Sequence, residues 1–209
     1  SQIAIARYKV DVGERNNVGF LATSREGKNY SNQLVSIDGS YWLSEEDSVQ
    51  YQYSYSNTVN PQSLLSEYSL KEKQQDYAVG IDYSHGTRDY NLTLGYKDVG
   101  SDFRADMGFV GKTGYKALQF SGEKTYFGEE SETFNRLGYF GSGDITYDQH
   151  GKQLSRSVEF LGFANGPMQF YANFGLIAGE EFYQNEYNQE GEYFSHMALS
   201  GFTTITPLP

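Results

Sequence analysis

The chain has 209 residues and a net charge of −11; 16% of its residues are aromatic and none is cysteine. The lack of cysteine excludes a disulfide-stapled scaffold and a thiolate metal site, and the acidic balance argues against a nucleic-acid binder that relies on a basic surface. No stretch approaches the roughly 18 consecutive apolar residues of a transmembrane helix, and the many aromatic residues argue against a disordered chain.

Apolar and polar residues alternate with a period of two along most of the chain, which is typical of β-strands. In the segment 48–56, for example, Val49, Tyr51 and Tyr53 share one side. This alternation predicts about eleven strands, and no segment has a helical period. In chain order, the predicted strands cover roughly residues 1–12, 17–25, 32–43, 48–56, 76–84, 89–97, 115–126, 133–147, 153–163, 168–179 and 193–203. The sequence therefore predicts an all-β fold.

The links between these strands form two alternating sets. The first set is short and comprises Gly13–Asn16, Ser44–Asp47, His85–Arg88, Phe127–Glu132 and Ala164–Pro167. The second set is mostly longer and comprises Glu26–Ser31, Asn57–Gln75, Asp98–Gly114, Asp148–Lys152 and Glu180–Glu192. Successive links of an antiparallel meander lie at opposite ends, and a transmembrane β-barrel has short turns at one end and long loops at the other. We therefore predict an antiparallel up-and-down meander that forms a transmembrane β-barrel.

Several apolar strand sides begin and end with tyrosine, as at Tyr77 and Tyr83. Amphipathic rings at both ends of an apolar side suit the two headgroup regions of a bilayer. The expected lipid-facing residues are Tyr51, Tyr53, Val79, Ile81, Leu92 and Leu94. The expected lumen-facing residues are Gln50, Gln52, Ser54, Asn91, Thr93 and Lys97. A soluble core would accept the same apolar sides, so a soluble β-sandwich or β-barrel stays an alternative.

Several segments resemble those of a known family in their order and spacing. These segments are Asp11–Asn16, Gly100–Val110, Asp148–Arg156, Asn165–Gly166 and Glu180–Phe182. Over most of its length the chain resembles a bacterial outer-membrane β-barrel family of uncharacterised function. Members of that family usually carry the barrel after a signal peptide and a domain similar to family-9 carbohydrate-binding modules. The resemblance implies an outer-membrane barrel of a Gram-negative bacterium.

The sequence departs from this family in one loop. Relatives tend to have Phe-Asn-Pro-Glu before Gly-Phe-Val and a basic residue, whereas this chain has Arg104, Ala105 and Asp106, with Lys112 near the basic position. We therefore expect the loop to differ in shape. No part of the chain corresponds to the carbohydrate-binding module, so the resemblance does not extend the module's glycan affinity to these residues.

The predicted strand number bears on domain organisation. Bacterial outer-membrane barrels have an even number of strands, and the last residues, 204–209, lack the terminal aromatic strand end that is usual for such barrels. We therefore expect residues 1–209 to form a single barrel domain or a part of a larger barrel. A miscount of one strand is the other interpretation.

The favoured function is that of an outer-membrane β-barrel segment with a polar lumen and long extracellular loops. Such a segment serves passage, docking or surface display and performs no chemistry of its own. Its expected location is the bacterial cell outer membrane. The expected partners are the lipid bilayer and lipopolysaccharide, with glycans or other outer-membrane subunits as further candidates. We expect no catalytic residue, no metal site, no cofactor and no nucleic-acid partner.

One acidic and aromatic link supports a competing function. Its candidate residues are Glu180, Glu181, Tyr183, Glu186, Tyr187 and Glu190. Glycosidases use two carboxylates, and carboxylates also bind divalent cations, so this link is a candidate site for a glycan or a cation. The alternative protein is a soluble β-sandwich or β-barrel that binds or hydrolyses glycans, although a solvated acidic loop explains the same residues. A third interpretation is a structural subunit whose strand edges pair with a partner chain.

Overall fold

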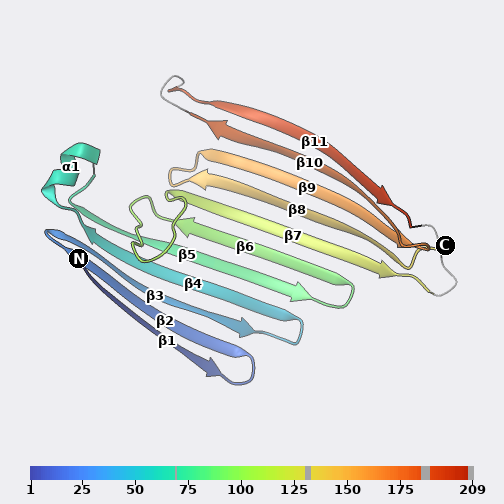
Figure 1. The fold of residues 1–209 in the computed structure, drawn as a ribbon, viewed down its shortest axis with the longest axis horizontal. Helices are drawn as coiled ribbons and strands as arrows, with labels where there is room; N and C mark the ends of the chain where they lie inside the picture. Colours follow the sequence, from blue (N-terminus) through green and yellow to red (C-terminus); the bar gives the residue numbers. More distant parts are fainter. Residues whose placement is uncertain (69, 130–132, 185–188, 207–209) are drawn as a thin grey trace. The chain divides into compact units, whose positions relative to one another are not determined.

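The computed structural model describes residues 1–68, 70–129, 133–184 and 189–206. Over these ranges the chain forms eleven strands and one short helix (Figure 1). In chain order the elements are β1 (Gln2–Val12), β2 (Asn16–Gly27), β3 (Tyr30–Trp42), β4 (Asp47–Val59), α1 (Gln62–Tyr68), β5 (Lys73–Gly86), β6 (Tyr90–Val99), β7 (Tyr115–Phe127), β8 (Arg136–Asp148), β9 (Gln153–Gly166), β10 (Phe170–Tyr183) and β11 (Glu192–Thr204). The predicted all-β class and all eleven strands are confirmed.

The strands form one antiparallel meander in which spatial order equals sequence order. β1 and β11 end this order and are not neighbours, so the sheet is open over the described residues and is not closed into a barrel. In the β3–β4 hairpin, the register places several residues of like character opposite each other. For example, Ser36 pairs with Ser54, and Val35 pairs with Tyr55.

Two details differ from the sequence prediction. The first is α1, whose seven residues follow Pro61 in the link between β4 and β5. Proline favours the start of a helix, but a helix of this length is too short to produce a recognisable period. The second is the start of β10, because Met168 and Gln169 have positive φ angles of 55° and 53° and belong to the preceding turn. No helix in the described part of the chain is long and apolar enough to cross a membrane.

The contacts divide the chain into two compact units. Unit 1 comprises residues 1–83, 95–117 and 148–151, and unit 2 comprises residues 84–94, 118–147 and 152–209. Unit 1 contains the two longest links, residues 60–72 and 100–114. Most of the residues outside strands in unit 1 therefore belong to these two links.

The two surfaces of the sheet in unit 1 differ in composition. One surface, which we call the polar face, contains Asn32, Leu34, Ser36, Ser54, Ser56 and Thr58, and all six of these side chains are buried. On the opposite surface, which we call the apolar face, Val35 is 57% and Ile81 45% exposed. The Tyr53 ring on that surface stacks on Tyr77 with centroids 6.5 Å apart. The buried side of the sheet is thus mainly polar and the exposed side mainly apolar.

In unit 2, large exposed side chains lie next to glycines of neighbouring strands. Gly162 pairs with Tyr139 on one side and with Phe174 on the other. The Tyr139 ring also stacks on Phe160, with centroids 6.4 Å apart. A Cβ built on Gly162 would meet no atom within 4 Å, so the rings of Tyr139 and Phe174 flank this glycine and do not cover it. This packing leaves an aromatic surface exposed in unit 2 as well.

Candidate functional site

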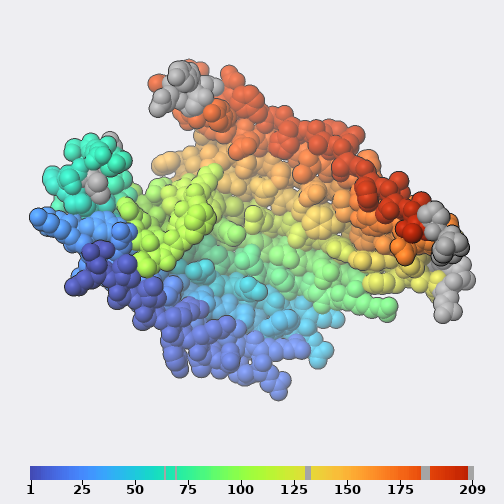
Figure 2. Space-filling view, in the orientation of Figure 1, coloured from blue at the N-terminus to red at the C-terminus, as the bar shows by residue number. Residues whose placement is uncertain are grey.

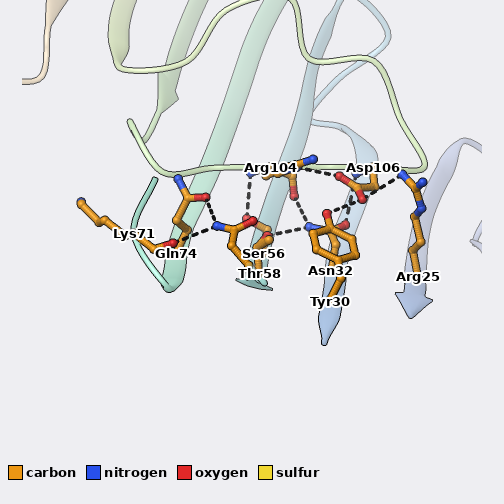
Figure 3. A network of polar contacts seen from close by, with 10 residues as sticks. Arg25, Tyr30, Asn32, Ser56, Thr58, Lys71, Gln74, Arg104 and Asp106 are labelled. Carbon is orange, nitrogen blue, oxygen red and sulfur yellow. Dashed lines mark hydrogen bonds and ion pairs between the residues drawn. The ribbon is translucent and has the colours of Figure 1, made fainter. Parts of the chain in front are cut away.

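The link between β6 and β7, residues 100–114, lies on the polar face of unit 1, and we call it the docked loop. Figure 2 shows it in yellow-green over the blue and cyan strands. Phe103, from this loop, and Leu34, from β3, are two of the few buried large apolar side chains among the described residues. Most of the other contacts that attach the loop to the strands are polar (Figure 3).

The backbone of the docked loop is bound by buried side chains of β3 and β4. The Asn32 side chain donates to the Arg104 carbonyl oxygen at 3.1 Å and accepts from the Asp106 N–H at 3.1 Å. Ser56 Oγ accepts from the Arg104 N–H at 3.0 Å. Thr58 Oγ1 accepts from Asn32 Nδ2 at 2.8 Å and so orients the amide. Because Asn32, Ser56 and Thr58 are fully buried, losing any of these bonds would leave a buried polar group without a partner.

A carboxylate cluster, composed of Asp106, Tyr30, Arg25 and Arg104, forms the second attachment. The Tyr30 hydroxyl donates to Asp106, and the two arginines form ion pairs with it at 3.2 Å and 2.8 Å. Both guanidinium groups also lie over the Tyr30 ring. Burial by itself would raise the pKa of Asp106, but the hydrogen bonds from Tyr30 and Arg104 and the two positive charges hold the pKa below its usual value. The carboxylate is therefore charged although its side chain is only 4% exposed.

The first residues of the loop approach β5 closely. The Gly100 N–H donates to the Tyr77 carbonyl at 2.9 Å, and a Cβ on Gly100 would lie only 1.9 Å from Asp76 Oδ1. Asp76 in turn accepts from the Asp102 N–H at 2.9 Å. The Asp102 carboxylate forms an ion pair with Lys71 from the α1 link. A side chain at position 100 would therefore have to displace the Asp76 carboxylate, which accepts the hydrogen bond from the Asp102 N–H.

Two adjoining cavities lie in unit 1, and residues of the docked loop line the first of them. The first has a volume of about 600 Å³ and is lined mainly by apolar side chains, among them Leu21, Leu34 and Phe103. The second has a volume of about 420 Å³ and is lined mainly by polar ones, among them Asn17 and Gln50. Both cavities share the residues Gln52, Gly80 and Lys97. They are therefore two adjoining spaces on the same face, one apolar and one polar.

The structure places most of the expected lumen-facing residues beside these cavities. Gln52 and Lys97 border both, Ser54 borders the apolar cavity, and Gln50 borders the polar cavity. Asn91 and Thr93 lie further along β6, on the same side of that strand as Lys97 by alternation. Of the residues that we expected to face lipid, Tyr51 borders the polar cavity and Val79 the apolar one.

The remaining expected lipid-facing residues lie on strands and are at least partly exposed. Tyr53, Ile81 and Leu94 are exposed, and Leu92 is half-buried.

The structure describes part of the acidic and aromatic link. Glu180, Glu181 and Tyr183 belong to β10, so these residues lie on a strand instead of a loop. Glu180 is held by an ion pair with Arg156 at 3.2 Å and a hydrogen bond from Gln153 at 3.2 Å. The Tyr183 ring packs edge-on against Phe194. Glu190 is exposed, and Glu186 and Tyr187 lie outside the described residues.

No group of three or more metal-ligating side chains occurs in the part of the chain that the structure describes. The docked loop also carries Lys112, whose Nζ lies over the Tyr115 ring, 5.9 Å from the ring centroid. The site consists of a loop fixed by hydrogen bonds and ion pairs, with two adjoining cavities on the same face.

Comparison with known protein families and with curated proteins found no match to this chain.

Sequence reasoning did not identify the residues that hold the docked loop. In the sequence, Arg104 and Asp106 differ from the pattern of the resembled family, and nothing distinguishes Asn32 or Tyr30 from other strand residues. Asn32 and Asp106 are 74 residues apart, so no local spacing links them. One signal was present: the side of the strand 48–56 opposite its tyrosines is rich in Ser and Gln, which predicts a surface with polar contacts.

Proposed function

We propose that the chain is a segment of an outer-membrane β-barrel whose polar face lines an aqueous passage and whose apolar face contacts lipid. In this proposal the docked loop narrows the passage. The protein serves solute passage, or docking and display at the cell surface, and performs no chemistry of its own. Its environment is the outer membrane of a Gram-negative bacterium, with lipopolysaccharide and bilayer lipid as its immediate partners.

The distribution of burial is the observation that carries this proposal. The buried hydrophobic residues are Leu34, Phe103 and Ala117 only, as far as the structure describes the chain. The buried polar residues include Asn32, Ser56 and the other polar-face side chains, whereas many large apolar side chains are exposed. Soluble proteins seldom expose contiguous apolar patches of this extent. Transmembrane barrels, in contrast, have an apolar outer surface and a polar interior.

The sheet topology and the loop give further support. Antiparallel meanders joined by hairpins are the architecture of outer-membrane barrels, and closure of the sheet would require strands or a partner in addition to β1–β11. Irregular backbone at membrane depth is tolerated where it is surrounded by protein or lines a water-filled cavity. The docked loop, fixed to the polar face by Asn32 and Asp106, meets this condition.

The glycan-directed alternative has less support. Glu180 is engaged by Arg156 and Gln153, and Tyr183 packs against Phe194. These contacts occupy the groups that a glycan site at this position would need.

Single-cysteine labelling tests the proposal directly, because the chain contains no native cysteine. Adjacent positions on opposite faces form matched pairs, for example Ile81→Cys with Asp82→Cys and Tyr53→Cys with Gln52→Cys. In vesicles of outer-membrane lipids, we expect the Asp82 and Gln52 variants to react with a water-soluble thiol reagent. The Ile81 and Tyr53 variants should instead be protected from this reagent. In a separate experiment, a fluorophore attached to either of these cysteines before the chain enters the vesicles should report an apolar environment.

Equal labelling on both faces would contradict the lipid contact of the apolar face. Passage is measured separately, by the swelling of vesicles in a small sugar. If the docked loop narrows the passage, release of the loop by Asp106→Asn should increase the swelling rate, whereas Asp11→Asn, at an exposed position at the end of β1, should not. An unchanged rate for the Asp106 variant would remove the constriction from the proposal.

A further inference from the structure

The geometry points to a binding site for an anionic amphiphile, such as an alkyl carboxylate, in the two adjoining cavities beside the docked loop. The alkyl body would occupy the apolar cavity beneath Phe103, and the carboxylate would lie at Lys97, where the two cavities meet. All lining residues belong to unit 1, so the site does not rest on the proposed contact between the opposite face and lipid.

The apolar cavity has the size and chemistry of a small-molecule site. Its volume of about 600 Å³ lies within the range of ligand pockets, which are mostly apolar with a few placed polar groups. The strands contribute Leu21 and Leu34, and the docked loop contributes Phe103 and Met107. Asn32 and Asp106 fix the loop above the strands, so the cavity is preformed. Burial of an alkyl chain against these side chains stabilises the complex by about 0.8 kcal/mol per methylene.

The charged groups at this cavity favour an anion. Lys97 and Lys112 line it, and no carboxylate does so among the described residues. This is notable in a chain with a net charge of −11. Lys9 and Lys97 also line the polar cavity, where Asp38 is neutralised by its ion pair with Arg7 and Asp82 is the other carboxylate. An ammonium beside a partly apolar space binds a carboxylate by a charge-assisted hydrogen bond.

Gly80 keeps the two cavities connected. It lines both of them, and a Cβ built on it would meet no atom within 4 Å. A larger side chain at this position would therefore enter the open space without displacing the strand. This makes Gly80→Leu a variant that fills the site and retains the fold. Gly162 in unit 2 has the same open surroundings, and Gly162→Leu is its matched control.

Isothermal titration calorimetry of the purified full chain in an amphipathic polymer, at pH 8, tests the site without detergent micelles. The probes are decanoate, decanol and decylamine, which share the alkyl chain and differ in charge. We expect decanoate to bind at one saturable site and the other two to bind at least about tenfold more weakly. Lys97→Gln should weaken decanoate about tenfold, and Lys97→Arg should restore binding.

The control substitution for charge is Lys28→Gln, which removes an exposed lysine of the β2–β3 hairpin outside both cavities. Lys28→Gln and Gly162→Leu should leave decanoate binding unchanged, whereas Gly80→Leu should abolish it with an unchanged circular dichroism spectrum. Equal binding of all three probes would overturn the proposal, because it would indicate adsorption to the apolar face. Full binding by the Lys97→Gln variant would overturn it as well.

Discussion

At the scale of single residues, Asp106 takes part in several of the polar contacts that attach the docked loop to the strands. Its backbone N–H binds Asn32, and its carboxylate binds Tyr30, Arg25 and Arg104. The carboxylate is buried and its partners are partly exposed. Truncation of one partner in such a cluster leaves a buried group without its bonds, which costs more than the pair contributes as a whole.

The depressed pKa of Asp106 predicts a pH dependence of loop docking. A carboxyl whose pKa is lower in the folded than in the unfolded state stabilises the fold above its unfolded pKa of about 3.9, and this contribution is lost as the pH falls through the folded pKa. We therefore expect the protection of the amides in residues 100–114, measured relative to their intrinsic exchange rate at each pH, to fall below pH 4. Mass spectrometry of the exchanged chain measures it.

Asp106→Asn separates this effect from the titration of other carboxyls. At pH 7 the variant should exchange faster in residues 100–114, by an amount that corresponds to a loss of about 1–3 kcal/mol in docking free energy. Its remaining pH dependence should be smaller than that of the parent chain. If the parent and the variant respond equally to acid, another carboxyl controls the docking of the loop.

The turn between β9 and β10 also depends on individual residues. Met168 and Gln169 both have positive φ angles, which side chains other than Asn, Asp and Gly rarely adopt. We expect the pair Met168→Asn and Gln169→Gly to raise the free energy of unfolding by roughly 1 kcal/mol, because Asn-Gly favours such turns. Denaturant titration measures the change. The control pair Glu45→Asn and Glu46→Gly, in a turn without positive φ angles, should not stabilise the chain.

At the scale of elements, the strands were predictable and the attachment of the loop was not. The alternation that defines β4 is local, because Tyr53 and Ser54 face opposite sides of one strand regardless of the rest of the fold. α1 has no such signal, since its seven residues complete about two helical turns. Docking of residues 100–114 depends on Asn32, which is distant in sequence, so only the assembled sheet brings the partners together.

The two faces of β5 should differ in their tolerance to a charge. If the apolar face contacts lipid, Ile81→Arg near the middle of the bilayer should lower the free energy of unfolding by roughly 2–4 kcal/mol. Asp82→Arg, on the adjacent position beside the polar cavity, should lower it much less. Unfolding by urea in lipid vesicles, followed by tryptophan fluorescence, compares the two. Similar losses in both variants would argue against the assigned faces.

At the scale of the whole molecule, the exposed apolar surfaces predict how the protein partitions. Val35, Ile81, Phe160 and Phe174 are exposed, and they come from both units. We expect the chain to fractionate with membranes and to require detergent for extraction, because water would have to hydrate this surface. Sedimentation of membranes and size-exclusion chromatography in and without detergent provide the measurement. A monodisperse protein at high concentration in detergent-free buffer would contradict the membrane assignment.

The polar burial on which the loop depends has a calorimetric consequence. Exposure of apolar groups to water raises the heat capacity of unfolding, and exposure of polar groups lowers it. A sheet that buries Asn32, Ser56 and Thr58 and already exposes its larger apolar side chains has little apolar area left to reveal. The heat capacity increment per residue should therefore be smaller than in a water-soluble domain of equal length, with a correspondingly flat dependence of stability on temperature.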